Sequence, residues 1–289
     1  MIPNRHYLMV VALLAGLAAC SSPEEPAEGQ NQAAAEAAPK RIALIGATAR
    51  SGRVIIRQAL EAGYEVTGLA RTPSKLGFEH ENLTLVKGDV RDIETLKAAL
   101  TGDEVVISMV GMSAPTDPNE QIGEVDLYTV MAENLISAMK DKGNKRLIMA
   151  SSAGVQDRVP NDATAPASNS MSDGWRFNAR FLYNDMADME TMIAESGLEY
   201  VLLRPGFLVE EPARHDLQVN KDGSTPHQRT LTYEDFAAFA LEQVDSGGYL
   251  NMAVGMYTDE IMDPEKEVKK FLEKLKKQQE AQKAAGTAQ

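Results

Sequence analysis

Residues 40–52 read KRIALIGATARSG, an apolar strand that runs into a turn of small residues and then into a helix. Small side chains let a phosphate come close to the backbone, and the free N–H groups and dipole of the helix attract the anion. The strand before the turn and the helix after it are the context that a dinucleotide-binding loop requires. The predicted contact residues in this loop are Gly46, Thr48, Ala49, Arg50, Ser51 and Gly52.

A second candidate element is Arg71, which follows the second predicted strand. NAD enzymes usually carry a carboxylate at this point for the ribose hydroxyls, whereas a basic residue suits the 2′-phosphate of NADP. We therefore expect NADP(H) to be favoured over NAD(H), with Lys75 and Arg50 able to add to the same pocket. The alternative is that Arg71 is a solvated charge at the end of a strand.

The next predicted strands end in residues that could line the rest of a dinucleotide. In an open parallel sheet the ligand lies at the carboxyl ends of the strands, with the adenine near the third strand and the nicotinamide ribose near the fourth. The candidate contacts are Asp89 and Val90 after the third strand, Val110, Gly111 and Met112 after the fourth, Ser151 and Ser152 after the fifth, and Pro205, Gly206 and Phe207 after the sixth.

Apolar strands and amphipathic helices alternate along the chain, which predicts parallel strands joined by crossover helices. Strands are expected at residues 41–46, 64–70, 83–88, 105–110, 146–151 and 200–204, and near 217–219 and 249–254. Helices are expected at residues 52–62, 92–100, 120–142 and 178–196, and from Thr232. The predicted fold class is α/β: a single doubly wound parallel-sheet (Rossmann) domain over residues 40–262, with helices on both faces.

From Lys40 to about Thr258 the chain resembles the atypical short-chain dehydrogenases with an NAD(P)-binding domain of the NmrA-like type, nearest to the biliverdin-IXβ (flavin) reductase type. The motifs that carry the resemblance are the GATARSG loop, residues 71–75 and 88–90, the Ser151-Ser152 pair, ESGLEY at 195–200 and Arg204-Pro205-Gly206. The resemblance implies NADP(H) and hydride transfer to a flat aromatic acceptor such as a flavin or a linear tetrapyrrole. It also implies that Ser152 lies near the nicotinamide and the acceptor, which makes it the candidate catalytic residue.

Two departures from the family pattern bear on the chemistry. Ala49 stands where the family usually has glycine, and its Cβ would crowd the pyrophosphate; if the position needs a positive φ, the strain is about 1 kcal/mol. Carbonyl-reducing relatives use a Tyr-x-x-x-Lys pair for proton transfer, but Tyr183 is followed four residues later by Ala187, and Met186 stands where many relatives carry a basic residue. A sugar-nucleotide epimerase or alcohol dehydrogenase is therefore not expected, whereas a flavin or quinone needs less acid–base help.

Residues 112–119 and 155–177 are expected to be long, irregular loops over the acceptor site. Trp175 and Phe177 could stack on a planar acceptor or pin the second loop to the core, and Phe207 is the better candidate for a pocket wall. The methionines near these elements are expected to fill the core rather than to form an acceptor surface. They are Met109, Met112, Met149, Met186, Met189 and Met192.

The first nineteen residues have the plan of an export signal, a basic start at Arg5 and His6 followed by a short apolar run. The run ends in Leu17-Ala18-Ala19-Cys20, which resembles the lipobox of bacterial lipoproteins, and Cys20 is the only cysteine of the chain. We expect acylation of Cys20, a solvated tether over residues 20–39, and a periplasm-facing lipoprotein of the bacterial envelope, by resemblance in the outer membrane because of Ser21. An ordinary signal peptide with a chance cysteine is the alternative.

The net charge of −13 argues against nucleic acid or an anionic lipid surface as the main partner. The four histidines are scattered without metal-ligand spacing, so no metal is expected. At the C-terminus, Asp263-Pro264-Glu265 predicts a helix start. That helix is expected either to dock on the domain or to bind a partner, and it is followed by a disordered tail to residue 289.

Two functions stay open. The first is a membrane-anchored reductase that transfers hydride from NADPH to a flavin-, quinone- or tetrapyrrole-like acceptor, which the set of cofactor positions favours. The second is a non-enzymatic NAD(P)-binding sensor or interaction scaffold, which Ala49 and the missing Tyr-Lys pair favour.

Overall fold

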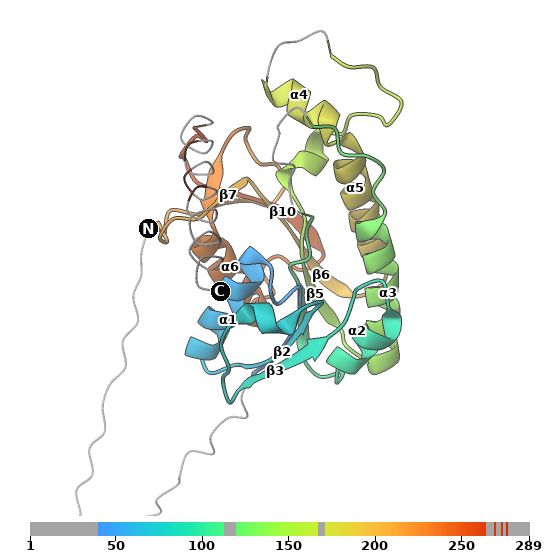
Figure 1. Cartoon of the computed structure of the whole chain (residues 1–289), viewed down its shortest axis with the longest axis vertical. Coiled ribbons are helices and arrows are strands. Elements are labelled where there is room, and N and C mark those ends of the chain that lie inside the picture. Colours follow the sequence, from blue (N-terminus) through green and yellow to red (C-terminus); the bar gives the residue numbers. More distant parts are fainter. Residues whose placement is uncertain are drawn as a thin grey trace, which may run out of the picture. The chain divides into compact units, whose positions relative to one another are not determined.

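The computed structural model describes residues 40–112, 120–166 and 171–263, together with residues 269, 273 and 276 (Figure 1). Within these residues an eight-stranded sheet forms the centre of the domain. Its strands, in their order across the sheet, are β3 (Leu83–Lys87), β2 (Glu65–Ala70), β1 (Arg41–Ile45), β4 (Val105–Ser108), β5 (Arg146–Ala150), β6 (Glu199–Pro205), β10 (Met252–Tyr257) and β8 (Gln218–Asn220). Neighbouring strands run parallel except for β8, which pairs antiparallel with β10 at the edge.

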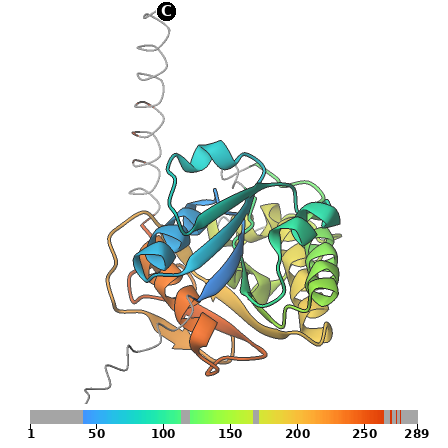
Figure 2. The ribbon, with the colours of Figure 1, turned by 90° about the horizontal axis from the view of Figure 1, so that it is seen from below.

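Helices cover both faces of this sheet, which confirms the predicted α/β fold class. The helices are α1 (Arg50–Glu61) and α6 (Tyr233–Asp245) on one face, and α2 (Ile93–Ala99), α3 (Leu127–Lys142) and α5 (Arg180–Glu195) on the other (Figure 2). In β1, Ile42 and Leu44 pack with the first group, whereas Ala43 and Ile45 pack with the second. All four are at most 1% exposed, as expected of a parallel strand that is covered on both sides.

Helix α3 begins at Leu127 rather than at residue 120 as predicted. Its first turn is capped from another helix: the carboxylate of Asp185 in α5 accepts hydrogen bonds from the backbone N–H groups of Tyr128 at 2.7 Å and Thr129 at 3.2 Å, and from the Thr129 hydroxyl at 2.6 Å. A carboxylate at a helix N-terminus satisfies free N–H groups and complements the helix dipole. Asp185 therefore fixes where α3 starts and ties α3 to α5.

Several short elements differ from the sequence expectation. The segment predicted as an irregular loop after β5 contains a 3₁₀ helix, η2 (Ala153–Asp157), and α4 (Met171–Asn178), which leads into α5 (Figure 1). Two unpredicted strands, β7 (Phe207–Val209) and β9 (Thr230–Thr232), pair in parallel as a second small sheet. Strand β10 starts later than predicted because residues 248–251 form a turn. Elements of three residues are too short to show a hydrophobic period.

Some predictions fall on parts of the chain that lie outside the described residues. They are the signal, Cys20 and the tether, residues 113–119 of the first predicted loop, residues 167–170 of the second, and most of the helix and tail after Asp263. Among the described residues, no helix combines the length and the apolar character needed to cross a bilayer.

Candidate functional site

The turn between β1 and α1 is built on two glycines that pack closely against backbone. Gly46 has φ +91°, and a Cβ on it would come within 3.0 Å of the Met109 backbone at the end of β4. A Cβ on Gly52 would lie 2.3 Å from the carbonyl oxygen of Gly46. The N–H groups of Gly46 and Ala47 both donate to the Leu69 carbonyl oxygen at 3.0 Å, so the turn is also fixed to the end of β2.

The N-terminus of α1 is left open by the side chains around it. Its N-cap is Ala49, no side chain caps it within the described structure, and its first turn carries no acidic residue. By contrast, Asp92 caps α2, Thr232 caps α6 and Asp185 caps α3, whereas α5, which also has no side-chain cap, follows directly on α4. An uncapped N-terminus presents free N–H groups and a positive dipole end, which is where a diphosphate binds.

Ala49 has φ −63° and ψ 157°, which is ordinary extended backbone. The strain considered for this position does not arise, because it would require a positive φ. Thr48 and Ala49 are half-buried, Ser51 is buried within the helix, and Arg50 is exposed beside the Tyr233 ring at 5.3 Å and Glu210 at 3.7 Å. The loop therefore has the predicted arrangement of strand, turn and helix. The Cβ of Ala49 is the one group that a glycine at this position would lack.

Arg71 and Lys75 lie beyond the end of β2, in the connection that includes the 3₁₀ helix η1 (Pro73–Leu76). Both side chains are exposed, and neither has an ion-pair partner among the described residues. Leu76 is buried and anchors this connection in the core. The two cations are therefore free to meet an anion at the edge of the sheet where the glycine turn lies.

Of the two candidate cofactor contacts after β3, Asp89 is half-buried and Val90 belongs to the core. Asp89 accepts a hydrogen bond from the Arg91 N–H at 3.0 Å. Val90 is 8% exposed, and its carbonyl oxygen accepts from the Asn134 amide at 3.0 Å. Val90 can therefore contribute backbone to a ligand site, but its side chain packs in the core.

The end of β4 differs from the sequence expectation at one residue. Val110 is half-buried and Gly111 is exposed; among the described residues only the Tyr128 hydroxyl lies within 4 Å of the place that a Cβ on Gly111 would take. Met112, predicted to fill the core, is 41% exposed, and its N–H donates to that hydroxyl at 3.1 Å. The prediction for Met112 is wrong: the residue lies four positions beyond the end of β4 at Ser108, where the neighbouring Gly111 is exposed as well. Of the other five, Met109, Met149, Met186 and Met189 are buried, and Met192 is partly buried and packed against the core.

The end of β6 holds its three candidates in different environments. Pro205 is buried, and a Cβ on Gly206 would lie 2.4 Å from the Arg229 carbonyl oxygen, so both serve packing. Phe207 is 42% exposed at the start of β7. The packed Pro205-Gly206 segment therefore places Phe207 at the surface, at the carboxyl edge of the sheet.

The two serines after β5 have different partners. Ser151 is buried and its hydroxyl donates to Glu190 of α5 at 2.5 Å. Glu190 also forms a two-point ion pair with Arg204 of β6, at 3.0 Å from Nε and 2.5 Å from Nη2. Ser152 is half-buried and its oxygen accepts from the Gly154 N–H at 3.1 Å. Ser151 is thus part of a buried network, and Ser152 is the serine that remains nearer to solvent.

Tyr183 of α5 lies next to Ser152, which sequence reasoning did not anticipate. The Trp175 indole N–H of α4 donates to the Tyr183 hydroxyl at 2.9 Å, and Gly154 packs directly on the Tyr183 ring. Burial raises the pKa of Tyr183, and hydrogen bonds with Trp175 and Ser152 offset this only in part. Ala187, one turn further along α5, is buried and supplies no positive charge. The phenol is therefore a weaker acid than free tyrosine.

The two aromatic residues of the second predicted loop contact the protein itself. Trp175 binds Tyr183, as described above, and the Phe177 ring lies 4.3 Å from the Arg180 guanidinium. Both contacts hold α4 against α5. They favour the interpretation in which these aromatic residues pin the segment in place.

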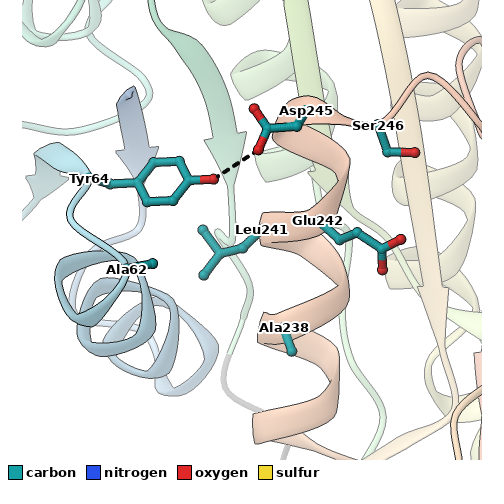
Figure 3. A pocket seen from close by; sticks show the side chains of 7 residues that line it. All are labelled: Ala62, Tyr64, Ala238, Leu241, Glu242, Asp245 and Ser246. Carbon is teal, nitrogen blue, oxygen red and sulfur yellow. Dashed lines mark hydrogen bonds between the residues drawn. The ribbon is translucent and has the colours of Figure 1, made fainter. Parts of the chain in front are cut away.

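A shallow groove of 380 Å³ lies at the opposite, amino edge of the sheet and is not part of this site (Figure 3). It is lined by Ala62, Tyr64, Ala238, Leu241, Glu242, Asp245 and Ser246. Here the Tyr64 hydroxyl donates to Asp245 at 3.3 Å, and Lys40 pairs with the same carboxylate at 2.5 Å. The lining of the groove is mainly apolar, and Tyr64 and Asp245 supply polar groups to it.

Comparison with known proteins gives a family match, a relative similar in sequence and solved structures with a similar fold. A family model described as NAD(P)H-binding matches residues 46–247. The photosystem II assembly factor Ycf39 of Cyanophora paradoxa is 40% identical over 113 residues, which are 39% of this chain and 30% of that protein. The chain thus spans less than a third of that relative.

Two solved structures share the fold at low sequence identity. ChuY, an anaerobillin reductase from Escherichia coli O157:H7, superposes with a TM-score of 0.59 at 19% identity, over 78% of this chain and 100% of that one. A short-chain dehydrogenase/reductase from Veillonella parvula in complex with NADP gives a TM-score of 0.58 at 18% identity, over 77% and 96%. At these identities the likeness concerns the fold.

Proposed function

Because this chain belongs to the NAD(P)H-binding family, we propose that it is a reductase that uses NADPH to reduce a planar, electron-poor acceptor. The observation that carries the proposal is the uncapped N-terminus of α1 behind Gly46, at the carboxyl edge of a parallel sheet. Ligands of open α/β sheets bind at this edge. Residues 46–52 would hold the diphosphate there, and the bound dinucleotide would supply the hydride.

The preference for NADPH is supported by charge. Arg71 and Lys75 are exposed at the end of β2 and have no ion-pair partner in the described structure. A 2′-phosphate on the adenosine ribose would give these cations a partner, whereas NADH would leave them as they are. NADPH therefore gains a favourable interaction that NADH does not have.

The acceptor is proposed to be a flavin, a quinone or a tetrapyrrole. Met112 and Phe207 expose apolar surface at the ends of β4 and β6, on either side of the strand that leads to Ser152. Such surfaces suit the faces of a flat ring system. Since the pKa of Tyr183 is raised by burial and Ala187 replaces the lysine, the site favours acceptors that take hydride on an electron-poor ring and a proton from solvent.

A non-catalytic NAD(P)-binding sensor or scaffold is the second candidate. It is favoured by the same Tyr183, whose hydroxyl is engaged by Trp175 and not activated by a nearby lysine. The name of the Cyanophora paradoxa relative, an assembly factor, is compatible with this role.

One assay separates the two functions. The purified protein is titrated with NADPH, NADP, NADH and NAD, and loss of the nicotinamide absorbance is then followed after addition of FMN, FAD or a quinone. A reductase binds NADPH and oxidises it when the acceptor is present. Tight binding without turnover identifies the sensor, and absence of all dinucleotide binding leaves only a scaffold.

The 2′-phosphate assignment has its own test. Arg71→Ala is expected to weaken NADPH binding about tenfold while changing NADH binding little, because one charge-assisted contact to the phosphate is lost. Arg57→Ala is the matched control, since Arg57 lies further along α1 and pairs with Glu234. Equal losses for both dinucleotides on Arg71→Ala would remove the assignment.

We further propose that Cys20 is acylated and anchors the protein in the bacterial envelope, facing the periplasm. The Leu17-Ala18-Ala19-Cys20 segment supports this placement. Mass spectrometry of the N-terminal peptide should show the lipid on Cys20, and Cys20→Ser should release the protein from the membrane fraction. An unmodified thiol in the mature protein would contradict the anchor.

A further inference from the structure

Arg53 of α1 joins two segments that lie far apart in the sequence. Its Nε donates to the carbonyl oxygen of Thr48 in the glycine turn at 3.3 Å. Its Nη1 donates to the carbonyl oxygen of Leu76 at 3.0 Å, and its Nη2 donates to that of Lys75. One guanidinium thus bridges the turn that begins α1 and the η1 connection that follows β2.

Both bridged segments carry candidate cofactor residues. The turn precedes the open N-terminus of α1, and the η1 connection carries Arg71 and Lys75, which have no ion-pair partner within the described part of the chain. Among the described residues, no carboxylate pairs with Arg53 either, so its charge adds to theirs at this edge of the sheet. Since the guanidinium presents its N–H groups as a rigid planar fork, it also sets the distance between the carbonyl groups that it contacts.

We infer that Arg53 is a positioning residue that holds the 2′-phosphate cations at the correct distance from the diphosphate turn, and so sets the preference for NADPH over NADH. The inference rests on the proposed use of NADPH. In NADPH the diphosphate and the 2′-phosphate are joined through one ribose, so the spacing of the two anions is fixed by the ligand. A protein that binds both must hold its two anion-binding segments at a matching spacing, because small misplacements are costly.

The test measures binding to the full-length protein by calorimetry, with two pairs of probes. The first pair is NADPH and NADH, and the second is adenosine 2′,5′-bisphosphate and ADP, which carry no nicotinamide. Arg53→Met is expected to weaken NADPH and the 2′,5′-bisphosphate about tenfold and the two probes without a 2′-phosphate by less than about threefold. Arg53→Lys is expected to behave in the same way, because an ammonium cannot reproduce the planar fork that contacts both segments.

Arg57→Met is the matched control, since it removes the same charge from the same helix but only breaks an exposed pair with Glu234. It should leave the ratio of NADPH to NADH affinity unchanged. If Arg53→Met and Arg53→Lys weaken all four probes equally, Arg53 supports the glycine turn alone and the inference is overturned. If the wild-type protein binds none of the probes, the proposed cofactor itself is refuted, and this result is distinct from the first.

Discussion

The buried ion pair between Glu190 and Arg204 allows a quantitative prediction. The Glu190 side chain is 8% exposed and that of Arg204 is 21% exposed, and the two meet through two short contacts while Ser151 donates a third hydrogen bond to Glu190. Glu190→Gln keeps the shape of the side chain but leaves Arg204 as an uncompensated charge. The free energy of unfolding is therefore expected to fall.

The size of the loss follows from the burial of the partner that remains. Removing one member of a buried ion pair costs about 3–5 kcal/mol. Because Arg204 keeps some contact with water, we expect the lower end of this range, about 3 kcal/mol. For a domain of this size about 1 kcal/mol shifts Tm by about 2–4 °C, so Glu190→Gln should lower Tm by about 6–12 °C.

The assay is thermal and urea unfolding of the variant beside a control on the same helix. Asp188 of α5 forms an exposed pair with Arg158 at 3.3 Å, and Asp188→Asn should cost about 0–1 kcal/mol. The double substitution Glu190→Met with Arg204→Met should recover much of the loss, because no buried charge is left without a partner. A Glu190→Gln variant as stable as Asp188→Asn would refute the reasoning.

Two further predictions concern the glycine turn and the start of α6. Gly52→Ala would place a Cβ 2.3 Å from the Gly46 carbonyl oxygen, so it should cost about 1–3 kcal/mol and weaken dinucleotide binding. Gly174→Ala is the control, since no atom of the described residues lies within 4 Å of the added Cβ, and it should not destabilise the protein. Equal stabilities of the two variants in urea would contradict this. Burial alone would raise the pKa of Asp235, but hydrogen bonds from the Arg214 N–H and the Thr232 hydroxyl outweigh it and hold that pKa below its usual value. The stability that Asp235 adds is present above its unfolded pKa of about 3.9 and is lost as the pH falls through the lowered folded pKa. The difference in unfolding free energy between wild type and Asp235→Asn should therefore shrink below about pH 4. A difference that does not change with pH would contradict this.

Features that depend on local sequence could be predicted. The apolar runs gave the main strands to within a few residues, because a covered parallel strand must be apolar on both faces, as Val106 and Ile107 are. The glycine turn was also predictable, since only residues without a large side chain allow the approach of Gly46 to β4. Asp92 caps α2 through its own neighbours in sequence, so this helix started where the pattern indicated.

Features that depend on contacts between distant residues could not be predicted. The sequence pattern extended α3 to residue 120, but Asp185 in another helix sets its start. The roles of Arg53 and Glu190 likewise depend on partners more than ten residues away. Alternating apolar and polar residues report one face of one element, and they carry no information about which side chain will reach a neighbouring element.

Trp175 is the only tryptophan of the chain, and it lies in α4 with its indole N–H bonded to Tyr183 beside Ser152. Indole emission overlaps the absorption band of a reduced nicotinamide. The native protein therefore carries a fluorophore beside Ser152, and energy transfer from it would register binding of the reduced coenzyme proposed above, and its oxidation, without any attached dye.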